Sequence, residues 1–254
     1  MADPNAGRFT WHELMTADTA TTAKFYTSLL GWKIQEMDMG PMGTYRLFLN
    51  GDKQVGGAMT SPPGVPSHWL PYVSTDSTDA TSKRITEFGG KLVVPPTDVP
   101  NMVRFAVGLD PQGAGFGIVQ NISDRTPEPI SDAPPAPGSF CWDELMSKDL
   151  PAAAKYYGSV FGWTGKTGEG AMPYWHWKHG DKDIGGMIAL PMPNVPPHWL
   201  AYIAVADVDA KTAKVKELGG KILMPSMDIE KVGKFSVVQD TSGASFALFR
   251  SARV

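Results

Sequence analysis

The residues best suited to chemistry include a glutamate that occurs twice in the same surroundings. The motif Trp-x-Glu-Leu-Met stands at residues 11–15 and again at 142–146. As a strand, this motif would place its Trp, Glu and Met on one face and its Leu on the other. A carboxylate that points into an apolar pocket has a raised pKa and can serve as a general acid or base. Glu13 and Glu144 are therefore the candidate catalytic residues.

A second repeated motif adds histidine and tyrosine. His-Trp-Leu-x-Tyr stands at residues 68–72 and again at 198–202. The same alternation puts its His, Leu and Tyr on one face of a strand. We expect this face to share a cavity with the glutamate of the first motif, so that each half of the chain surrounds one small ligand. The candidate ligand-binding residues are Trp11, His68, Tyr72, Trp142, His198 and Tyr202.

Each of these residues also has a purely structural interpretation. The glutamates can be fixed anchors bonded to the backbone or to a neighbouring His or Tyr, and the histidines can be satisfied by the backbone beside a Pro-rich turn. The tyrosines can be core residues whose hydroxyl reaches water. Trp69 and Trp199 can be flat walls for a planar ligand or ordinary core residues. For the glutamates and histidines the structural interpretation is the commoner case.

Both motifs belong to a duplication of the whole chain. Gly-Trp at 31–32 recurs at 162–163, an offset of 131 (162 − 31), and Gly-Gly-Lys at 89–91 recurs at 219–221, an offset of 130 (219 − 89). Matches in one order with so little drift indicate two copies of one domain. Prolines and small polar residues separate the copies and predict an extended linker. The predicted division is a first domain at 1–122, a linker at 123–138 and a second domain at 139–254.

Hydrophobic periodicity and turn residues predict the element order β-α-β-β-β four times, twice in each domain. Asp18 or Thr19 can begin the first helix, and Gly31 ends it. The predicted fold class is α+β, with four βαβββ modules paired into two domains that have curved mixed sheets and helices outside. The first module is predicted as a strand at 9–16, a helix to about 30, and strands at 32–39, 44–50 and 54–60.

The composition narrows the classes of partner. A formal net charge of −3 over 254 residues argues against a nucleic-acid protein. No apolar run is long enough for a bilayer, and the first residues lack the pattern of a signal peptide. The single cysteine, Cys141, suits a reducing cytoplasm and is predicted to be a structural thiol. We expect a cytoplasmic monomer or homodimer whose partner is a small molecule.

Both copies share a further set of residues in the same order. They are Leu14, Asp18, 24–26 and 30–32 with their copies Leu145, Asp149, 155–157 and 161–163, followed by Asp110, Gly113 and Phe116 with their copies Asp240, Gly243 and Phe246. This pattern resembles the glyoxalase/bleomycin-resistance/extradiol-dioxygenase superfamily, also called vicinal oxygen chelate proteins. The resemblance implies the paired-module fold. It does not fix the reaction, because the superfamily contains lyases, epimerases, dioxygenases, thiol transferases and pure binding proteins.

The resemblance also implies where a divalent metal would be held. In the family His, Glu or Gln ligands lie at the ends of cavity-facing strands, and the metal acts as a Lewis acid. The corresponding positions hold Trp11, Leu70, Gly117 and the run 55–58 in the first copy, and Trp142, Leu200, Ala247 and the run 184–187 in the second. None of them offers a ligand side chain, so we expect no metal cofactor. A displaced Glu–His site is the alternative, with two ligands per copy where catalytic sites use three.

Two functions follow from this sequence. The first is binding of a small organic molecule in a cavity of each domain without the usual metal site. The alternative is a metal-independent lyase, isomerase or hydroxylase-like enzyme that uses Glu13 or Glu144 as its general base. The second copy alone has Trp175, His176, Trp177 and His179. On a strand, His176 faces away from the two tryptophans, and the difference predicts that the two cavities do not bind identically.

Overall fold

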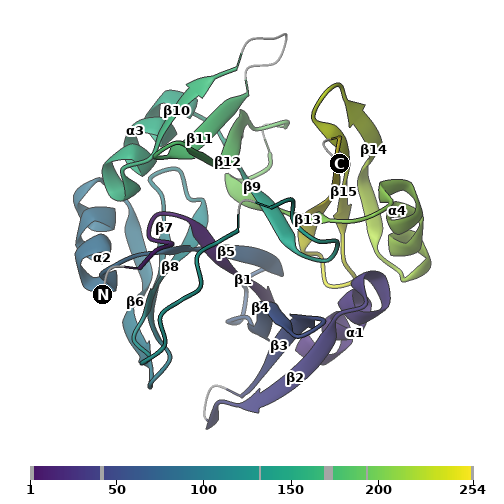
Figure 1. The fold of residues 1–254 in the computed structure, drawn as a ribbon, viewed down its shortest axis with the longest axis horizontal. Helices are drawn as coiled ribbons and strands as arrows, with labels where there is room; N and C mark the ends of the chain where they lie inside the picture. The colour runs from purple at the N-terminus through teal and green to yellow at the C-terminus, as the bar shows by residue number, and fades with distance from the viewer. Residues whose placement is uncertain (1–2, 41–42, 132, 169–173, 193, 253–254) are drawn as a thin grey trace. The chain divides into compact units, whose positions relative to one another are not determined.

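The computed structural model describes residues 3–40, 43–131, 133–168, 174–192 and 194–252. Within these ranges the chain forms four helices and two eight-stranded mixed sheets, which are curved and open (Figure 1). The predicted α+β class and the fourfold βαβββ order are confirmed. No helix among the described residues has the length and apolar character needed to cross a membrane.

The first sheet has the strand order β2-β3-β4-β1-β5-β8-β7-β6. The outer strands of each module pair antiparallel, whereas β1 with β4 and β5 with β8 pair parallel. The elements are β1 (Phe9–Thr16), α1 (Thr19–Leu30), β2 (Lys33–Asp38), β3 (Thr44–Asn50), β4 (Lys53–Thr60), β5 (His68–Ser74), α2 (Thr78–Glu87), β6 (Lys91–Val99), β7 (Val103–Leu109) and β8 (Gly115–Asn121).

The second sheet repeats this order as β10-β11-β12-β9-β13-β16-β15-β14. Its parallel pairs are β9 with β12 and β13 with β16. The elements are β9 (Phe140–Ser147), α3 (Leu150–Phe161), β10 (Thr164–Thr167), β11 (Trp175–His179), β12 (Lys182–Ala189), β13 (His198–Ala204), α4 (Val208–Glu217), β14 (Lys221–Ile229), β15 (Gly233–Gln239) and β16 (Ser245–Ser251).

The sequence signals set the helix ends. The side chain of Asp18 accepts a hydrogen bond from the N–H of Thr21, which caps the start of α1. Gly31 ends the helix in the left-handed conformation, with φ 77°. Asp149 and Gly162 do the same for α3. Of the two residues predicted to begin α1, the structure selects Asp18, and Gly31 ends the helix as predicted.

One strand runs further than its sequence suggests. The sequence predicts a strand at 91–94 that ends before Pro95 and Pro96, but β6 continues to Val99. Proline cannot donate to a strand ladder and is confined to sheet edges or bulges. β6 is the edge strand of its sheet, and its pairing with β7 shifts register around these residues, which is why the prolines are tolerated. β14 has the same place and contains Pro225.

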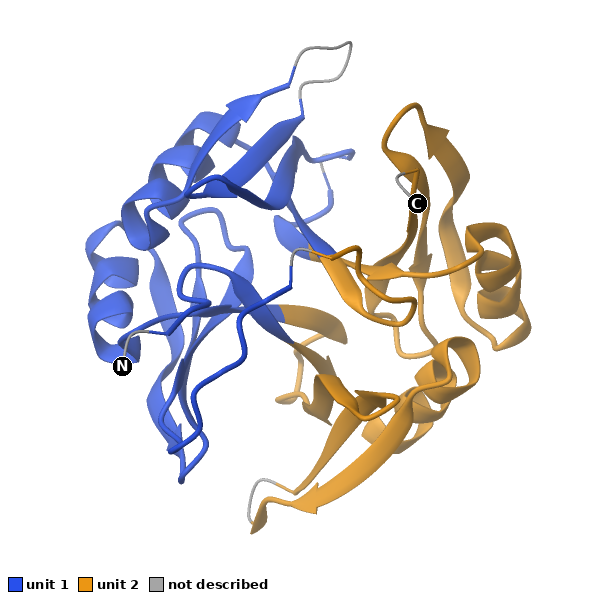
Figure 2. Cartoon of the chain, in the orientation of Figure 1, with its two compact units in different colours: residues 1–11, 71–132, 142–199 blue, residues 12–70, 133–141, 200–254 orange. Residues whose placement is uncertain are grey.

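By its internal contacts the chain divides into two compact units (Figure 2). Each unit contains segments of both sequence repeats. The division predicted at 123–138 describes the repeats and stays a prediction for the domains. Unit 1 comprises residues 1–11, 71–132 and 142–199, and unit 2 comprises residues 12–70, 133–141 and 200–254.

The linker is held by hydrogen bonds inside these units. In unit 1 the buried side chain of Asn5 donates to the carbonyl of Glu128 and accepts the N–H of Ile130, both at 2.8 Å. In unit 2 the indole of Trp32 donates to the carbonyl of Gly138 at 2.8 Å. Glu128, Ile130 and Gly138 of the predicted linker are therefore each hydrogen-bonded within the unit that contains them.

The core of unit 1 is built around a buried tyrosine of α3. The hydroxyl of Tyr157 donates to Asp110 at 3.1 Å and accepts the indole N–H of Trp199 at 3.0 Å. The other carboxylate oxygen of Asp110 accepts the N–H groups of Gln112 and Ala114. Burial nevertheless raises the pKa of the Asp110 carboxyl above its ordinary value.

The core of unit 2 repeats this arrangement. Tyr26 of α1 donates to Asp240 at 2.8 Å and accepts the indole N–H of Trp69 at 2.8 Å. Trp69 and Trp199 are both buried in hydrophobic cores. The structure therefore favours the core interpretation of these two tryptophans over that of a wall for a ligand.

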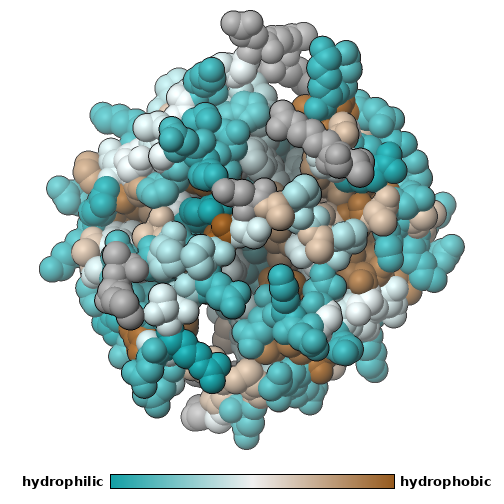
Figure 3. All heavy atoms as spheres, in the orientation of Figure 1, coloured by the Kyte–Doolittle hydropathy of each residue, from teal (hydrophilic) through white to brown (hydrophobic). Residues whose placement is uncertain are grey.

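Hydrophilic residues cover most of the face seen in Figure 3, and hydrophobic residues lie on it in scattered patches. Several large apolar side chains are exposed on β14 and at its end. They are Ile222, Leu223, Met227, Ile229 and Val232.

The two neighbouring tyrosines of α3 give a matched test of the core. Tyr157→Phe removes a hydrogen bond to the buried Asp110, and we expect it to lower the free energy of unfolding by about 1–3 kcal/mol. The hydroxyl of Tyr156 is buried without a hydrogen-bond partner among the described residues, so Tyr156→Phe should be neutral or stabilising. Denaturant titration of the two variants measures the difference. Equal losses for both would contradict this account.

Candidate functional site

The strand β9 places its two chemically useful side chains on one face. Leu145 lies in the hydrophobic core with the residues of α3, so the flanking Trp142 and Glu144 face the other way. Glu144 is 5% exposed, and Trp142 is half-buried. Leu14 lies in the core with α1 in the same manner, and Glu13 beside it is 7% exposed. Leu14 and Leu145 therefore lie on the core side of their strands, and the cavity that the two glutamates are expected to face stays a prediction.

A tyrosine that precedes β11 connects the two residues in unit 1. The indole N–H of Trp142 donates to the hydroxyl of Tyr174 at 2.7 Å. The Tyr174 hydroxyl donates in turn to the Glu144 carboxylate. Burial and then the charge of Glu144 raise the pKa of Tyr174 above its ordinary value. The hydroxyl therefore stays protonated and remains a donor to the carboxylate.

A glycine makes room for this tyrosine. Gly186 on β12 pairs directly with Glu144 on β9 and with His176 on β11. A Cβ at Gly186 would overlap the hydroxyl of Tyr174. The glycine therefore lets the tyrosine lie flat across the strand beside the carboxylate.

Unit 2 contains the counterpart of this arrangement. Gly57 on β4 pairs directly with Glu13 on β1. A Cβ at Gly57 would overlap the hydroxyl of Tyr45. Each repeat therefore combines a buried glutamate, a facing glycine and a tyrosine that covers the glycine.

The predicted histidines lie at strand starts with backbone partners. Nδ1 of His68 donates to the carbonyl of Pro66, and Nδ1 of His198 donates to the carbonyl of Pro196, both at 2.8 Å. This contact orients each imidazole beside its Pro-rich turn, as the structural interpretation expects. Whether the second ring nitrogen contacts a ligand stays a prediction.

The predicted tyrosines of the second motif are buried against aromatic rings. The centroids of Tyr72 and Phe105 lie 6.5 Å apart, and Tyr202 lies 6.3 Å from both Phe235 and Phe249. Trp11 is half-buried on β1. The roles of Trp11, Tyr72 and Tyr202 in ligand binding stay predictions.

The residues at the family's metal positions do not fit a metal. Gly117 stands where a glutamate ligand is expected, and the ring of Tyr72 fills the space that a Cβ there would need. Leu70 and Leu200 are buried and apolar. Among the described residues, His, Cys, Asp and Glu nowhere form a group of three that could hold a metal ion. Catalytic sites of this type need three such ligands.

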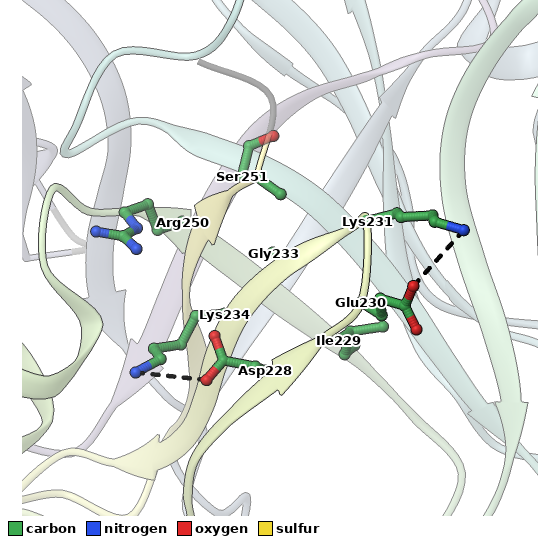
Figure 4. A pocket seen from close by; sticks show the side chains of 9 residues that line it. Asp228, Ile229, Glu230, Lys231, Gly233, Lys234, Arg250 and Ser251 are labelled. Carbon is green, nitrogen blue, oxygen red and sulfur yellow. Dashed lines mark ion pairs between the residues drawn. The ribbon is translucent and has the colours of Figure 1, made fainter.

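A small cavity lies elsewhere in unit 2, at the end of the β14–β15 hairpin (Figure 4). Its volume is about 210 Å³. Two loose ion pairs lie on its wall, Lys234 with Asp228 and Lys231 with Glu230, both at 3.6 Å. None of the residues predicted from the sequence lines this cavity.

Sequence reasoning missed the two tyrosines of the site. Tyr45 and Tyr174 are separated by 129 residues (174 − 45), the same offset as the Gly-Asp-Lys runs at 51–53 and 180–182. That shared offset marks them as equivalent. Their role depends on a glycine of the next strand, and strand alternation alone does not reveal it.

A family model described as the Glyoxalase/Bleomycin resistance protein/Dioxygenase superfamily matches residues 8–118 and 142–248. The chain therefore belongs to this superfamily. Two full-length relatives are similar to it. "Putative glyoxylase CFP32" of Mycobacterium bovis is 32% identical, covering 95% of this chain and 94% of the relative. "Anthracycline biosynthesis protein DnrV" of Streptomyces peucetius is 31% identical, covering 94% of this chain and 91% of the relative.

Solved structures share the fold at low sequence identity. The Mn(II)-bound glyoxalase from Novosphingobium aromaticivorans gives a TM-score of 0.68 at 14% identity, covering 97% of this chain and 82% of that one. The 2,3-dioxygenase LapB from Pseudomonas sp. KL28 gives a TM-score of 0.65 at 12% identity, covering 96% of this chain and 92% of that one.

The close approach at Gly186 leads to a test of the site's geometry. Gly186→Ala should displace the Tyr174 hydroxyl and cost about 1–3 kcal/mol of unfolding free energy by overpacking. In a Tyr174→Leu background the ring is absent, so the same change should cost much less. Denaturant unfolding of the four proteins of this cycle measures the coupling. An equal cost in both backgrounds would show that Tyr174 does not occupy this space.

The buried hydroxyls also predict the alkaline behaviour. Burial, followed by the charge of a neighbouring carboxylate, raises the pKa of Tyr26, Tyr157 and Tyr174. The unfolded chain releases these protons near the ordinary pKa of about 10, and the folded chain retains them. Unfolding free energy should therefore fall as the pH rises above about 10. Spectrophotometric titration should show these three tyrosines ionising only as the chain unfolds. Ionisation of all seven tyrosines of the chain near the ordinary pKa in the folded state would refute this.

Proposed function

We propose that the protein binds a small organic molecule at the glutamate–tyrosine face of each repeat, without the metal site usual in its family. The observation that carries this proposal is the chain of hydrogen bonds from Trp142 through Tyr174 to Glu144. Its polar groups are fixed before any ligand arrives. Fixed polar groups beside an aromatic wall are typical of small-molecule sites.

The hydrogen bonds that join Trp142, Tyr174 and Glu144 favour recognition of a ligand over abstraction of a proton from it. A hydrogen bond to the charged form of a carboxyl group favours that form. Because Tyr174 donates to Glu144, the carboxylate already accepts one hydrogen bond from the protein. It is a good acceptor for a hydroxyl or amide group of a ligand.

The comparisons support a small organic molecule as the partner. One relative carries the name of a glyoxylase and another that of an anthracycline biosynthesis protein. The Mn(II)-bound glyoxalase shares the fold. The metal-independent part of the proposal rests instead on Gly117 and Leu70, which stand where ligands of a metal are expected.

A second candidate function is catalysis without a metal. The burial of Glu13 and Glu144 favours it, because a carboxylate shielded from water can act as the general base of a lyase, an isomerase or a hydroxylase-like enzyme. One polypeptide carries both glutamates, so neither function requires the protein to form a dimer.

Metal analysis and ligand titration test the proposal together. We expect the purified, dialysed chain to hold less than stoichiometric zinc, nickel, iron or manganese. Quenching of tryptophan fluorescence against a panel of metabolites should identify a ligand. For that ligand, Glu144→Gln should raise the dissociation constant of one of the two sites by about tenfold, as expected for a lost charge-assisted hydrogen bond. Glu13→Gln tests the other repeat.

Tyr156→Phe is the control, because it removes a buried hydroxyl of unit 1 that lies in the core near Gly90. It should leave the affinity unchanged. Stoichiometric metal that survives dialysis would contradict the metal-free site. Binding and turnover that both glutamine variants leave intact would rule out a role for the carboxylates.

A further inference from the structure

Four residues of unit 1 lie in one row across four neighbouring strands. Lys166 on β10 pairs with His176 on β11, His176 pairs with Gly186 on β12, and Gly186 pairs with Glu144 on β9. Directly paired residues present their side chains on the same face of a sheet. The row therefore has a lysine and a histidine at one end and a carboxylate at the other. Three strand spacings make it about 14 Å long.

The equivalent row of unit 2 has no basic group. Gln35 on β2 pairs with Leu47 on β3, Leu47 pairs with Gly57 on β4, and Gly57 pairs with Glu13 on β1. The glycine and the glutamate are common to both rows. The two positions at the other end have changed from glutamine and leucine to lysine and histidine.

His176 is available for a ligand within the described part of the chain. Two aromatic rings lie beside it, with centroid distances of 4.9 Å to Tyr174 and 6.3 Å to Trp142. The imidazole is half-buried, and its nitrogens have no hydrogen-bond partner among the described residues. The two rings pack against the imidazole, and its Cδ2 and Nε2 atoms lie 3.9 Å from the position that a Cβ on Gly168 would take.

Lys166 adds a positive charge beside this imidazole. It is exposed on the edge strand β10 and forms no ion pair with any residue that the structure describes. Lysine acts as a point charge toward anionic oxygen, and neutral imidazole can donate one hydrogen bond to it. The carboxylate of Glu144 repels an anion at the far end of the row. The row therefore has a basic end at Lys166 and His176, where an anionic group is favoured, and an acidic end at Glu144.

We propose that unit 1 binds a planar conjugated molecule with an acidic phenol or enol group, whose ionised oxygen lies at His176 and Lys166. Its ring system lies beside Trp142, and a second polar group of the molecule meets Tyr174 and Glu144. Unit 2 lacks the basic end of the row, so the chain has one site for such an acid. This inference rests on the proposed function and narrows the class of its ligand.

A pair of probes that differ only in the acidic group tests the inference. The hydroxynaphthoquinone lawsone is an enol that is ionised at neutral pH, and its O-methyl ether cannot ionise. Calorimetric titration of the full chain should show one site for lawsone, at least about tenfold tighter than for the ether. The double variant Lys166→Gln/His176→Leu copies the row of unit 2, and it should bind both probes with similar affinity.

Lys178→Gln is the matched charge control. Lys178 lies on β11 and pairs with Asp183 at 3.2 Å, outside the row. The preference for lawsone should survive this change, and unfolding curves should confirm that all variants are folded. Two equal lawsone sites, equal affinities for the two probes, or a preference that the double variant retains would each overturn the inference. If neither quinone binds but the metabolite panel yields a ligand that requires Glu144, the inference fails while the proposed function stands.

Discussion

A buried hydrogen bond between a helix tyrosine and a turn aspartate holds each compact unit together. It joins Tyr157 to Asp110 in unit 1 and Tyr26 to Asp240 in unit 2. A buried carboxylate without such partners costs several kcal/mol, so the turn, the helix and the nearby indole must assemble together. In each pair the tyrosine and the aspartate come from different sequence repeats. Each buried aspartate therefore takes backbone partners from its own turn and its tyrosine partner from the other repeat, and the duplication is part of how the core is completed.

This shared constraint explains why the two repeats differ where they do. The core side of β9 must keep Leu145 against α3, and the core side of β1 must keep Leu14 against α1. The opposite faces of β9 and β1 have no such packing requirement. There both repeats keep only the glutamate, the glycine that faces it and the tyrosine that covers the glycine. Substitutions at the far end of the row, such as His176 in place of Leu47, therefore change the chemistry without disturbing the hydrogen bonds of the core.

Local signals in the sequence were sufficient to predict the helices and strands, and the face of a strand that packs on the core. Asp18 and Gly31 mark the ends of α1 because capping and left-handed backbone depend on single residues. The site was only partly predictable. Alternation placed Glu144 on the face opposite Leu145, but the bond to Tyr174 depends on which side chain of a neighbouring strand lies over a glycine. The bond of Asp110 to Tyr157 likewise joins residues 47 positions apart, which no local pattern specifies.

The prolines of the outermost strands have a consequence for the behaviour of the protein at high concentration. A sheet edge with regular unpaired N–H and C=O groups is a template for strand addition and aggregation. Pro95 and Pro96 on β6, and Pro225 on β14, each remove a donor from such an edge. The register shifts beside them interrupt the ladder further. The β6 edge of one sheet and the β14 edge of the other thus discourage fibrillar growth, although β14 exposes apolar side chains.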